Sequence, residues 1–354
     1  MNSVRRSHNW PVASPLTKAW QNGALPALVG TTQCALRHRR YFLVLGNRKR
    51  LPYSDPRTSY AAPAVEPRRR RLPPKRHLTA RRVRLGCELR KLRESMGMKS
   101  REAAALLGAD SVQMSQIESG VAGVSAKRLR RLAVHYACTD EGLIEALVAM
   151  ATDRTRGWWE EYRGVLPPVF LDTAEVEHHA TALREIVITH VPGLLQTTDY
   201  ARAVYTYMMP GLPDSELTPR IEHRMRRRCV IEGAEPTPYE TIIHEFALRV
   251  RVADRAVAQA QLHQILTQIE DGHATVRIIP ADQDGFAGAE ASMMQACGPV
   301  PQLDTVLRDS PTGTAFIDAE PQLNQLRTLF RKVEKASLSP AASRDFIHRL
   351  TKEL

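Results

Sequence analysis

Residues Gly97–Gly120, which read GMKSREAAALLGADSVQMSQIESG, decide the fold of the first half of this 354-residue chain. Ser100–Leu107 is a run of good helix formers, and Gly108 follows it as glycine commonly follows a helix C-terminus. Asp110 precedes Ser111–Glu118, where its carboxylate can accept hydrogen bonds from exposed backbone N–H groups. The spacing therefore predicts two short helices joined by a tight turn, which is a helix-turn-helix layout.

Helical patterns continue on both sides of this stretch. One helix is expected from Arg81 to Met96, a fourth from Ser125 to about His135, and a fifth over Asp140–Met150. The apolar positions expected to face their common core are Leu85, Leu89, Leu92, Ala103, Ala104, Met114, Ile117, Leu129, Leu132 and Ala133. Residues 81–150 are thus predicted to form a mainly α, five-helix domain.

The second helix of the pair has two unlike faces. Met114 and Ile117 lie three residues apart and anchor one face to the core. The other face carries Ser111, Val112, Gln113, Ser115 and Gln116. Gln and Ser side chains can hydrogen-bond base edges, and a helix N-terminus attracts phosphate. The pattern fits DNA binding, and it also fits a small helical bundle that merely packs.

The same stretch resembles the XRE family of lambda-repressor- and Cro-like helix-turn-helix regulators. The likeness rests on Ala103 in the first helix, Gly108 in the turn, and the ending Ile117-Glu118-Ser119-Gly120. It implies that the helix Ser111–Glu118 enters the major groove of double-stranded DNA. The DNA-binding residues expected on this basis are Ser100, Arg101, Ser111, Val112, Gln113, Ser115, Gln116, Lys127 and Arg128. A homodimer is expected, because one short helix reads only a few base pairs.

Three departures from that family pattern leave a second hypothesis open. Lys99-Ser100 replaces a Thr-Gln pair, Ser111-Val112-Gln113 replaces a Gln-Ser-Lys-like start, and Val121-Ala122 stands where basic residues often follow. Each lost contact weakens binding, by about 1–3 kcal/mol for a good bidentate base contact. The alternative is a protein–protein adaptor whose helix-turn-helix has decayed.

The net charge of +12 is unevenly distributed along the chain. Residues 1–80 hold 16 Lys and Arg against 2 Asp and Glu, residues 81–150 carry a net charge of +4, and residues 151–354 carry −6. A proline-rich, like-charged segment resists compaction, so 1–80 is predicted to be a disordered basic tail. Three interpretations stay open: an arm that grips phosphate, a transit peptide, or a translation start that lies further downstream.

Residues 151–354 are predicted to form an α+β domain with helices around a small mixed sheet. The expected helices are Glu175–Ile186, Leu194 to about Met208, Asp214–Ile231, Arg255–Asp271, Leu323–Lys335 and Pro340–Leu354; the expected strands are Val187–Val191, Thr241–Phe246, Ala274–Pro280, Ala291–Cys297 and Asp304–Leu307. The arginine-rich helix Asp214–Ile231 is interpreted as solvated rather than as a second nucleic-acid face. Trp158-Trp159 is interpreted as aromatic core rather than as a ligand shelf or an interdomain plug.

This half resembles the domain of unknown function that follows the helix-turn-helix in a large group of actinobacterial regulators. The likeness rests on Gly157-Trp158-Trp159-Glu160-Glu161-Tyr162, on the stretch VPGLLQTTDYAR at 191–202, and on Leu338-Ser339-Pro340 with Ser343. It implies a domain that senses a ligand or binds a partner. A small acidic partner protein, in an antitoxin-like arrangement, is also implied.

Catalysis, metals and membranes are not indicated. The sequence contains no HExxH, GxSxG, GxGxxG or Walker-type loop. His178-His179 diverge on a helix, and Asp282, Asp284 and Gly285 lack the later ligands of a calcium loop. The five scattered cysteines fit a reducing compartment, and no run of about 18 apolar residues occurs. The sequence predicts a non-enzymatic, cofactor-free regulator in the cytoplasm, associated with the nucleoid.

Overall fold

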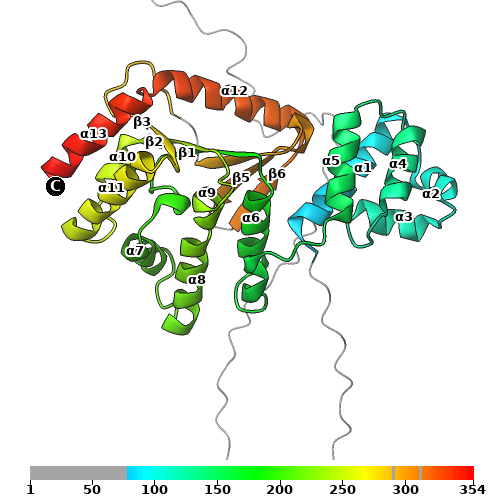
Figure 1. Ribbon diagram of the computed structural model, residues 1–354, viewed down its shortest axis with the longest axis horizontal. Helices are drawn as coiled ribbons and strands as arrows, with labels where there is room; N and C mark the ends of the chain where they lie inside the picture. Colours follow the sequence, from blue (N-terminus) through cyan, green and yellow to red (C-terminus); the bar gives the residue numbers. More distant parts are fainter. Residues whose placement is uncertain (1–77, 289–291, 311–312) are drawn as a thin grey trace, which may run out of the picture. The chain divides into compact units, whose positions relative to one another are not determined.

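The computed structural model describes residues 78–288, 292–310 and 313–354. The expected basic tail lies outside these residues, apart from Leu78, Thr79 and Ala80. The N-terminal helices are α1 (Ala80–Ser95), α2 (Ser100–Leu107), α3 (Ser111–Glu118), α4 (Ala126–His135) and α5 (Glu141–Thr152). The prediction of a five-helix N-terminal domain is confirmed (Figure 1).

Small residues set how closely these helices approach one another. Ala103 and Ala104 of α2 are almost completely buried, as are Met114 and Ile117 of α3. Gly108 ends α2 with φ of +64°, and the next N–H bonds back to the Ala104 carbonyl at 2.9 Å. A left-handed residue of this kind lets the chain turn sharply from α2 into α3.

The remaining residues form a six-stranded mixed sheet with helices on both faces. Its strands are β1 (Ala182–Val187), β2 (Tyr239–His244), β3 (Thr275–Ile279), β4 (Met293–Cys297), β5 (Thr305–Ser310) and β6 (Gly313–Ile317), in the order β3-β2-β1-β4-β5-β6. Strands β1, β2 and β3 pair in parallel, and β1, β4, β5 and β6 pair antiparallel. The α+β prediction is confirmed.

Thirteen α-helices in all are assigned within the described residues, eight of them in this part. They are α6 (Pro168–His178), α7 (Thr198–Met208), α8 (Asp214–Arg226), α9 (Cys229–Glu232), α10 (Glu245–Arg249), α11 (Arg255–Glu270), α12 (Glu320–Ala336) and α13 (Pro340–Glu353). Three 3-10 helices accompany them: η2 (Trp158–Tyr162), η3 (Gly193–Leu195) and η4 (Pro301–Leu303). No described helix has the length and hydropathy needed to cross a bilayer.

The two faces of the sheet have separate cores, because side chains alternate along each strand. Ile186 and Ile242 pack on one face against Phe330 of α12. Leu183 and Ile243 pack on the other, with apolar residues of α7, α11 and α13. Figure 1 shows α12 on one side of the sheet and α6, α7, α8 and α11 on the other. The second face extends beyond this core and forms one wall of a pocket described below.

Several details of the sequence-based prediction are wrong. The expected strand Thr241–Phe246 ends at His244, where α10 follows, and the helix expected from Leu194 begins only at Thr198. Glu175–Ile186 is not one helix: α6 ends at His178, and Ala182–Val187 is strand β1. Val187–Val191 is consequently not a separate strand, and β6 was not predicted. The expected helix Asp214–Ile231 is divided by a turn at Arg227 and Arg228.

The error at β1 has a physical cause. ALREIV consists largely of good helix formers, so its local preference favours a helix. In the fold, however, β1 pairs with β2 on one side and with β4 on the other. Leu183 and Ile186 are completely buried, one on each face of the sheet. Burial and pairing at the centre of a sheet outweigh a helical preference of this size.

Candidate functional site

Helix α3 presents its predicted polar face to solvent. Ser111, Ser115 and Gln116 are exposed, Gln113 is half-buried, and Val112 is 62% exposed. The opposite face, Met114 and Ile117, is sealed in the core of the helical domain. The residues that sequence reasoning assigned to a DNA groove therefore lie together on one accessible surface.

The start of α3 is already occupied by an anionic group of the protein. The Asp110 carboxylate accepts a hydrogen bond from the Gln113 N–H at 2.7 Å. A phosphate at this helix terminus would meet the Asp110 charge, so the predicted attraction by the helix terminus is weakened here. The Ser100 hydroxyl is buried and has no hydrogen-bond partner in the described structure, so it is not open to solvent.

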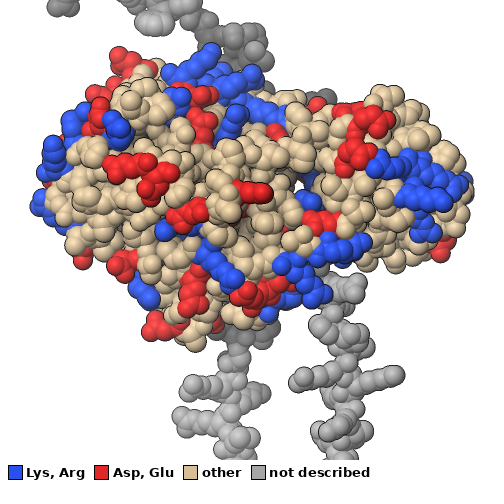
Figure 2. All heavy atoms as spheres, in the orientation of Figure 1, with Lys and Arg blue, Asp and Glu red and all other residues tan. Residues whose placement is uncertain are grey.

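Basic side chains gather beside α3. Helix α2 contacts both α3 and α4, and Figure 2 shows Lys and Arg concentrated over α2 and α4. Arg101, Lys127 and Arg128 are exposed in this region. Among the residues that the structure describes, none of the three forms an ion pair. They are placed to meet phosphates beside a groove-bound α3.

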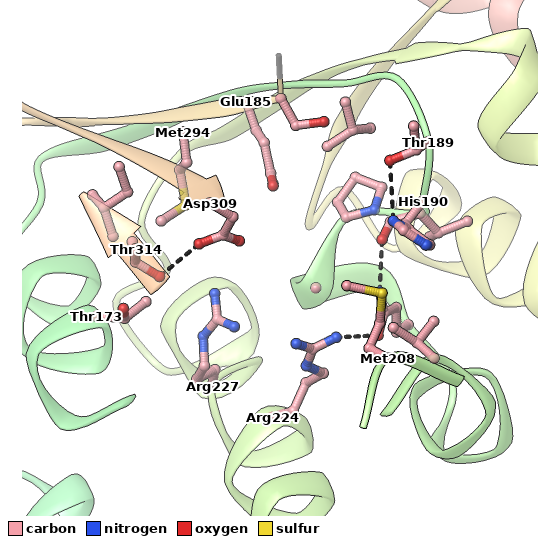
Figure 3. A pocket seen from close by; sticks show the side chains of 18 of the residues that line it. Thr173, Glu185, Thr189, His190, Met208, Arg224, Arg227, Met294, Asp309 and Thr314 are labelled. Carbon is pink, nitrogen blue, oxygen red and sulfur yellow. Dashed lines mark hydrogen bonds between the residues drawn. The ribbon is translucent and has the colours of Figure 1, made fainter. Parts of the chain in front are cut away.

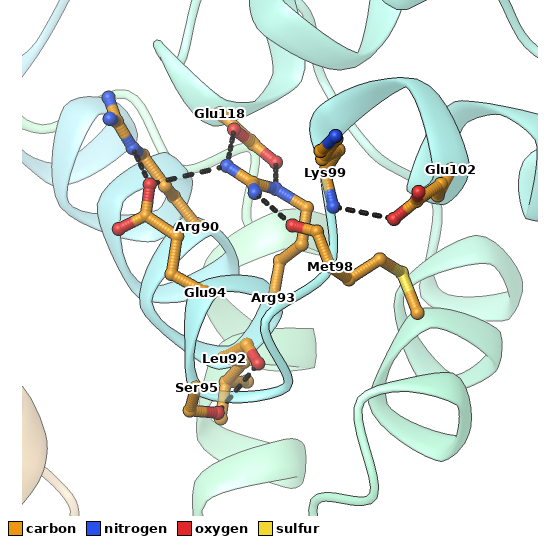
Figure 4. A network of polar contacts seen from close by, with 9 residues as sticks. All are labelled: Arg90, Leu92, Arg93, Glu94, Ser95, Met98, Lys99, Glu102 and Glu118. Atoms are coloured by element: carbon orange, nitrogen blue, oxygen red, sulfur yellow. Dashed lines mark hydrogen bonds and ion pairs between the residues drawn. The ribbon is translucent and has the colours of Figure 1, made fainter.

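A buried ion pair fixes the end of α3. Arg93 of α1 donates from Nε and Nη2 to the two carboxylate oxygens of Glu118, at 2.6 and 2.9 Å, and from Nη1 to the Met98 carbonyl (Figure 4). The two charged side chains are only 7% and 9% exposed. The Glu118 of the motif Ile117-Glu118-Ser119-Gly120 therefore has a structural role: it ties α3 to α1 and so fixes the direction of α3.

The C-terminal part contains a pocket of about 630 Å³. Its lining residues lie between Val169 and Thr314, on α6, α7, α8, the loop after β1 and the strands β1, β4, β5 and β6, with Met209, Arg227 and Ser292 next to these elements. Strand residues Glu185 and Asp309 face it from the sheet, and Arg224 and Arg227 lie across from them (Figure 3). A volume of this size lies in the range of small-molecule sites.

Arg227, which lines the pocket, is held by a buried carboxylate outside the lining. Glu177 of α6 is 1% exposed, and its carboxylate accepts hydrogen bonds from Nε and Nη2 of Arg227. The distance from Nε to Oε2 is 2.8 Å. Burial acts to lower the pKa of Arg227, yet the carboxylates of Glu177 and Glu185 raise it overall. Burial raises the pKa of Glu185 to about 7, against the hydrogen bond from Tyr239 and the charge of Arg227.

The arginines of α8 and the turn after it also hold the loop after β1. Arg224 donates to the Gln196 side chain at 2.8 Å, and Arg228 donates to the Gln196 carbonyl at 2.6 Å. Gln196 in turn donates to the Val191 carbonyl at 2.8 Å. The stretch VPGLLQ, singled out above, is thus one wall of the pocket. The interpretation of this arginine-rich helix as solvated is wrong for Arg220, Arg224, Arg227 and Arg228, which are all buried or half-buried.

Each of the paired tryptophans lies against the apolar core around α6. Trp159 is 3% exposed and packs with Leu171 and Ala174, and Trp158 is partly buried against the same cluster. The Trp158 ring lies 4.9 Å from the ring of His223, a residue of the pocket wall. The interpretation of the pair as aromatic core fits this packing.

A pH-dependent contribution to stability is expected from Glu185. Because its folded pKa of about 7 exceeds the usual 4.5, the folded state holds a proton that the unfolded state releases between these values. This contribution to stability is complete below about pH 4.5. It is lost as the pH rises from there through about 7, and the free energy of unfolding falls by up to about 1.4 kcal/mol per pH unit.

Replacing Glu185 with Gln removes the titrating group and keeps its shape. The variant is expected to gain stability relative to the wild type between pH 5 and pH 8. Urea unfolding of both proteins, followed by circular dichroism, measures the difference. Parallel pH profiles for the two proteins would contradict the expectation.

Potential metal ligands do not cluster in the part of the chain that the structure describes. Within residues 78–288, 292–310 and 313–354, no group of three or more His, Cys, Asp or Glu side chains is arranged to hold a metal ion. The pocket was missed from the sequence because its walls come from segments far apart along the chain. The stretch VPGLLQ, which contributes Val191, Pro192, Gly193 and Gln196 to the lining, is the local signal that points to it.

Both the helical domain and the C-terminal part match known protein families. Residues 84–147 match a helix-turn-helix domain, and residues 170–349 match a domain of unknown function (DUF5753). The second match covers 180 of the 354 residues, which is more than half of the chain. No curated protein and no solved structure matches the chain.

The molecule is therefore a helix-turn-helix protein with an α+β C-terminal domain. The chain belongs to the DUF5753 family. The expected combination of a helix-turn-helix regulator with a C-terminal domain of unknown function is confirmed, and the helix-turn-helix supports a DNA-binding regulator. Membership of the XRE family stays a prediction.

Proposed function

We propose that this protein is a sequence-specific transcriptional regulator that binds double-stranded DNA on the nucleoid, in the cytoplasm. Residues 81–150 form the DNA-binding part, and residues 151–354 regulate it. The observation that carries the proposal is the exposed polar face of α3, opposite the buried Met114 and Ile117. A helix supported on one side and open on the other is what insertion into a major groove requires.

Each exposed residue has a defined role in this proposal. Gln113 and Gln116 hydrogen-bond base edges, Ser111 and Ser115 add shorter contacts, and Val112 meets a thymine methyl group. The side chains of Arg101, Lys127 and Arg128 bind the DNA backbone. Ser100 is left out of the set, because its hydroxyl is buried.

The proposal extends to assembly and regulation. Two copies bind as a homodimer, since two half-sites about one helical turn apart supply the affinity that one short helix lacks. The pocket of about 630 Å³ in the C-terminal part supports sensing of a small molecule. The small acidic partner protein implied by the resemblance has no comparable supporting observation.

Replacing both Gln113 and Gln116 with Ala tests the role of α3. Each lost base contact costs about 1–3 kcal/mol, so specific affinity is expected to fall by at least tenfold while non-specific affinity is kept. A gel-shift series on fragments bound by the wild type measures this. The matched control replaces Gln322 and Gln325, two exposed glutamines three residues apart on α12, and is expected to bind as the wild type does. Equal loss in both variants would contradict the assignment.

The adaptor hypothesis keeps one specific observation in its favour, the Asp110 carboxylate at the start of α3. The two functions differ in the salt dependence of binding. A DNA-binding regulator that neutralises several phosphates loses affinity steeply as salt increases, and it discriminates between sequences. An adaptor forms no sequence-specific complex at any salt concentration.

A further inference from the structure

One edge of the Arg224 guanidinium is left without a partner in the described structure. Its Nη1 donates to Gln196, its Nε is buried without a hydrogen bond, and its Nη2 is not buried and forms no hydrogen bond with a described residue. The neighbouring Arg227 uses the corresponding edge, Nε and Nη2, to hold Glu177. This edge of a guanidinium matches the two oxygens of a carboxylate. Arg224 also lies 4.4 Å from the centre of the Tyr205 ring, which fixes its position.

The opposite side of the pocket carries two carboxylates. Glu185 accepts from the Tyr239 hydroxyl at 2.5 Å, and Asp309 accepts from the Thr314 hydroxyl at 2.6 Å. Each therefore has a hydroxyl partner, and neither forms an ion pair with a basic side chain of the described residues. Figure 3 shows both carboxylates facing the same space as Arg224 and Arg227.

Apolar residues line the pocket on both of these sides. Val204, Tyr205, Met208 and Met209 line it on the helical side, and Met294 lines it on the sheet. Methionine side chains are flexible and adapt to irregular apolar ligands. The volume of about 630 Å³ exceeds what a single ion or one small polar group occupies.

We propose that this pocket binds a small zwitterion with an apolar body, of about the size of a di- or tripeptide. Its carboxylate pairs with Arg224, and its ammonium group lies between Asp309 and Glu185. Its apolar body packs on the methionines that line the pocket, which are Met208, Met209, Met293 and Met294. The inference rests on the proposed function, because it names the class of small molecule that the C-terminal part senses.

A ligand with a single charge fits less well. An anion would satisfy Arg224 but bring negative charge near Glu185 and Asp309. A cation would satisfy the two carboxylates and leave Arg224 desolvated without a counter-charge. An uncompensated buried charge opposes binding strongly. Only a molecule with both charges complements both sides of the pocket.

Isothermal titration calorimetry of the full-length chain with three matched probes tests whether the ligand is a zwitterion. The probes are the dipeptide Leu-Phe, its N-acetylated form and its C-terminal amide, which share one apolar body. Leu-Phe is expected to bind, and each blocked form is expected to bind at least tenfold more weakly. Leu-Leu-Phe, with its own two blocked forms, covers the larger size.

Two substitutions assign the ends of the ligand. Arg224→Gln is expected to weaken the binding of Leu-Phe at least tenfold. This variant should no longer discriminate against the C-terminal amide, but it should still discriminate against the N-acetylated form. Asp309→Asn is expected to show the reverse pattern. Arg251→Gln, at an exposed arginine outside the pocket, is the control and is expected to bind as the wild type does. Thermal unfolding of each variant establishes that it is folded.

The inference is overturned if neither free peptide binds at millimolar concentration, or if blocked and free forms bind equally. A gel-shift measurement on the same preparations separates the two proposals. Loss of peptide binding with an intact DNA complex overturns only the ligand class. Absence of any specific DNA complex, with peptide bound, overturns the proposed regulator function instead.

Discussion

Replacing Glu118 with Gln is expected to lower the free energy of opening of the helical domain by about 3–5 kcal/mol. The substitution keeps the shape of the side chain and removes its charge. Arg93 is only 7% exposed and donates to both carboxylate oxygens. Without that carboxylate, the charged partner that Arg93 keeps among the described residues is Glu94, in a weaker contact with Nη2 at 3.4 Å, and the last turn of α3 loses its charged tie to α1.

Hydrogen exchange of peptides from α1 and α3, read by mass spectrometry, measures this local free energy in the intact chain. The control is Glu145→Gln, which removes another ion pair, that of Glu145 with Arg130, where both side chains are about half exposed. Exposed pairs contribute little, so this variant is expected to exchange as the wild type does. Equal protection in all three proteins would contradict the role assigned to Glu118.

Replacing Gly86 with Ala is the second change with a large expected effect. A Cβ atom at this position would lie 2.5 Å from the Glu118 carbonyl oxygen and 2.8 Å from that of Ile117. Both are backbone atoms, which cannot move aside alone, so α1 and α3 must separate. Overpacking of this kind costs about 1–3 kcal/mol. The sign of the change in stability is diagnostic. In a helix without such a contact, replacing Gly with Ala would stabilise the protein by about 1 kcal/mol.

Gly123→Ala provides the matched control. A Cβ atom there would have no heavy atom within 4 Å, and its backbone is not left-handed. That variant is expected to be unchanged or slightly more stable, because Ala restricts the unfolded chain. Hydrogen exchange in α1 and α3 again provides the measurement. Increased stability of Gly86→Ala would show that the two helices are not in close contact.

The helical domain was predictable because its signals are local. Gly108, Asp110 and Ser125 mark helix ends within a few residues of the groups they bond, and the structure places them at those ends. Strand β1 was not predictable in the same way. Its residues prefer a helix locally, and only β2 and β4, about 56 and 110 residues further along the chain, make it a strand.

The two candidate sites differ for the same reason. The exposed face of α3 follows from a 3.6-residue period, so the sequence alone predicts its members. The pocket depends on partners such as Arg227 and Glu177, which lie 50 residues apart in the sequence. A cluster of arginines accompanied by glutamates is typical of a solvated helix, and nothing local reveals that several of them turn inward.

The most direct test of the regulator proposal is selection of genomic DNA fragments by the full-length protein, followed by footprinting. The wild type is predicted to enrich discrete fragments and to protect two half-sites about one helical turn apart. The variant with Gln113 and Gln116 both replaced by Ala is predicted to lose those footprints, and the variant at Gln322 and Gln325 to keep them. Uniform binding without enrichment, or identical footprints in all three proteins, would contradict the role proposed for α3.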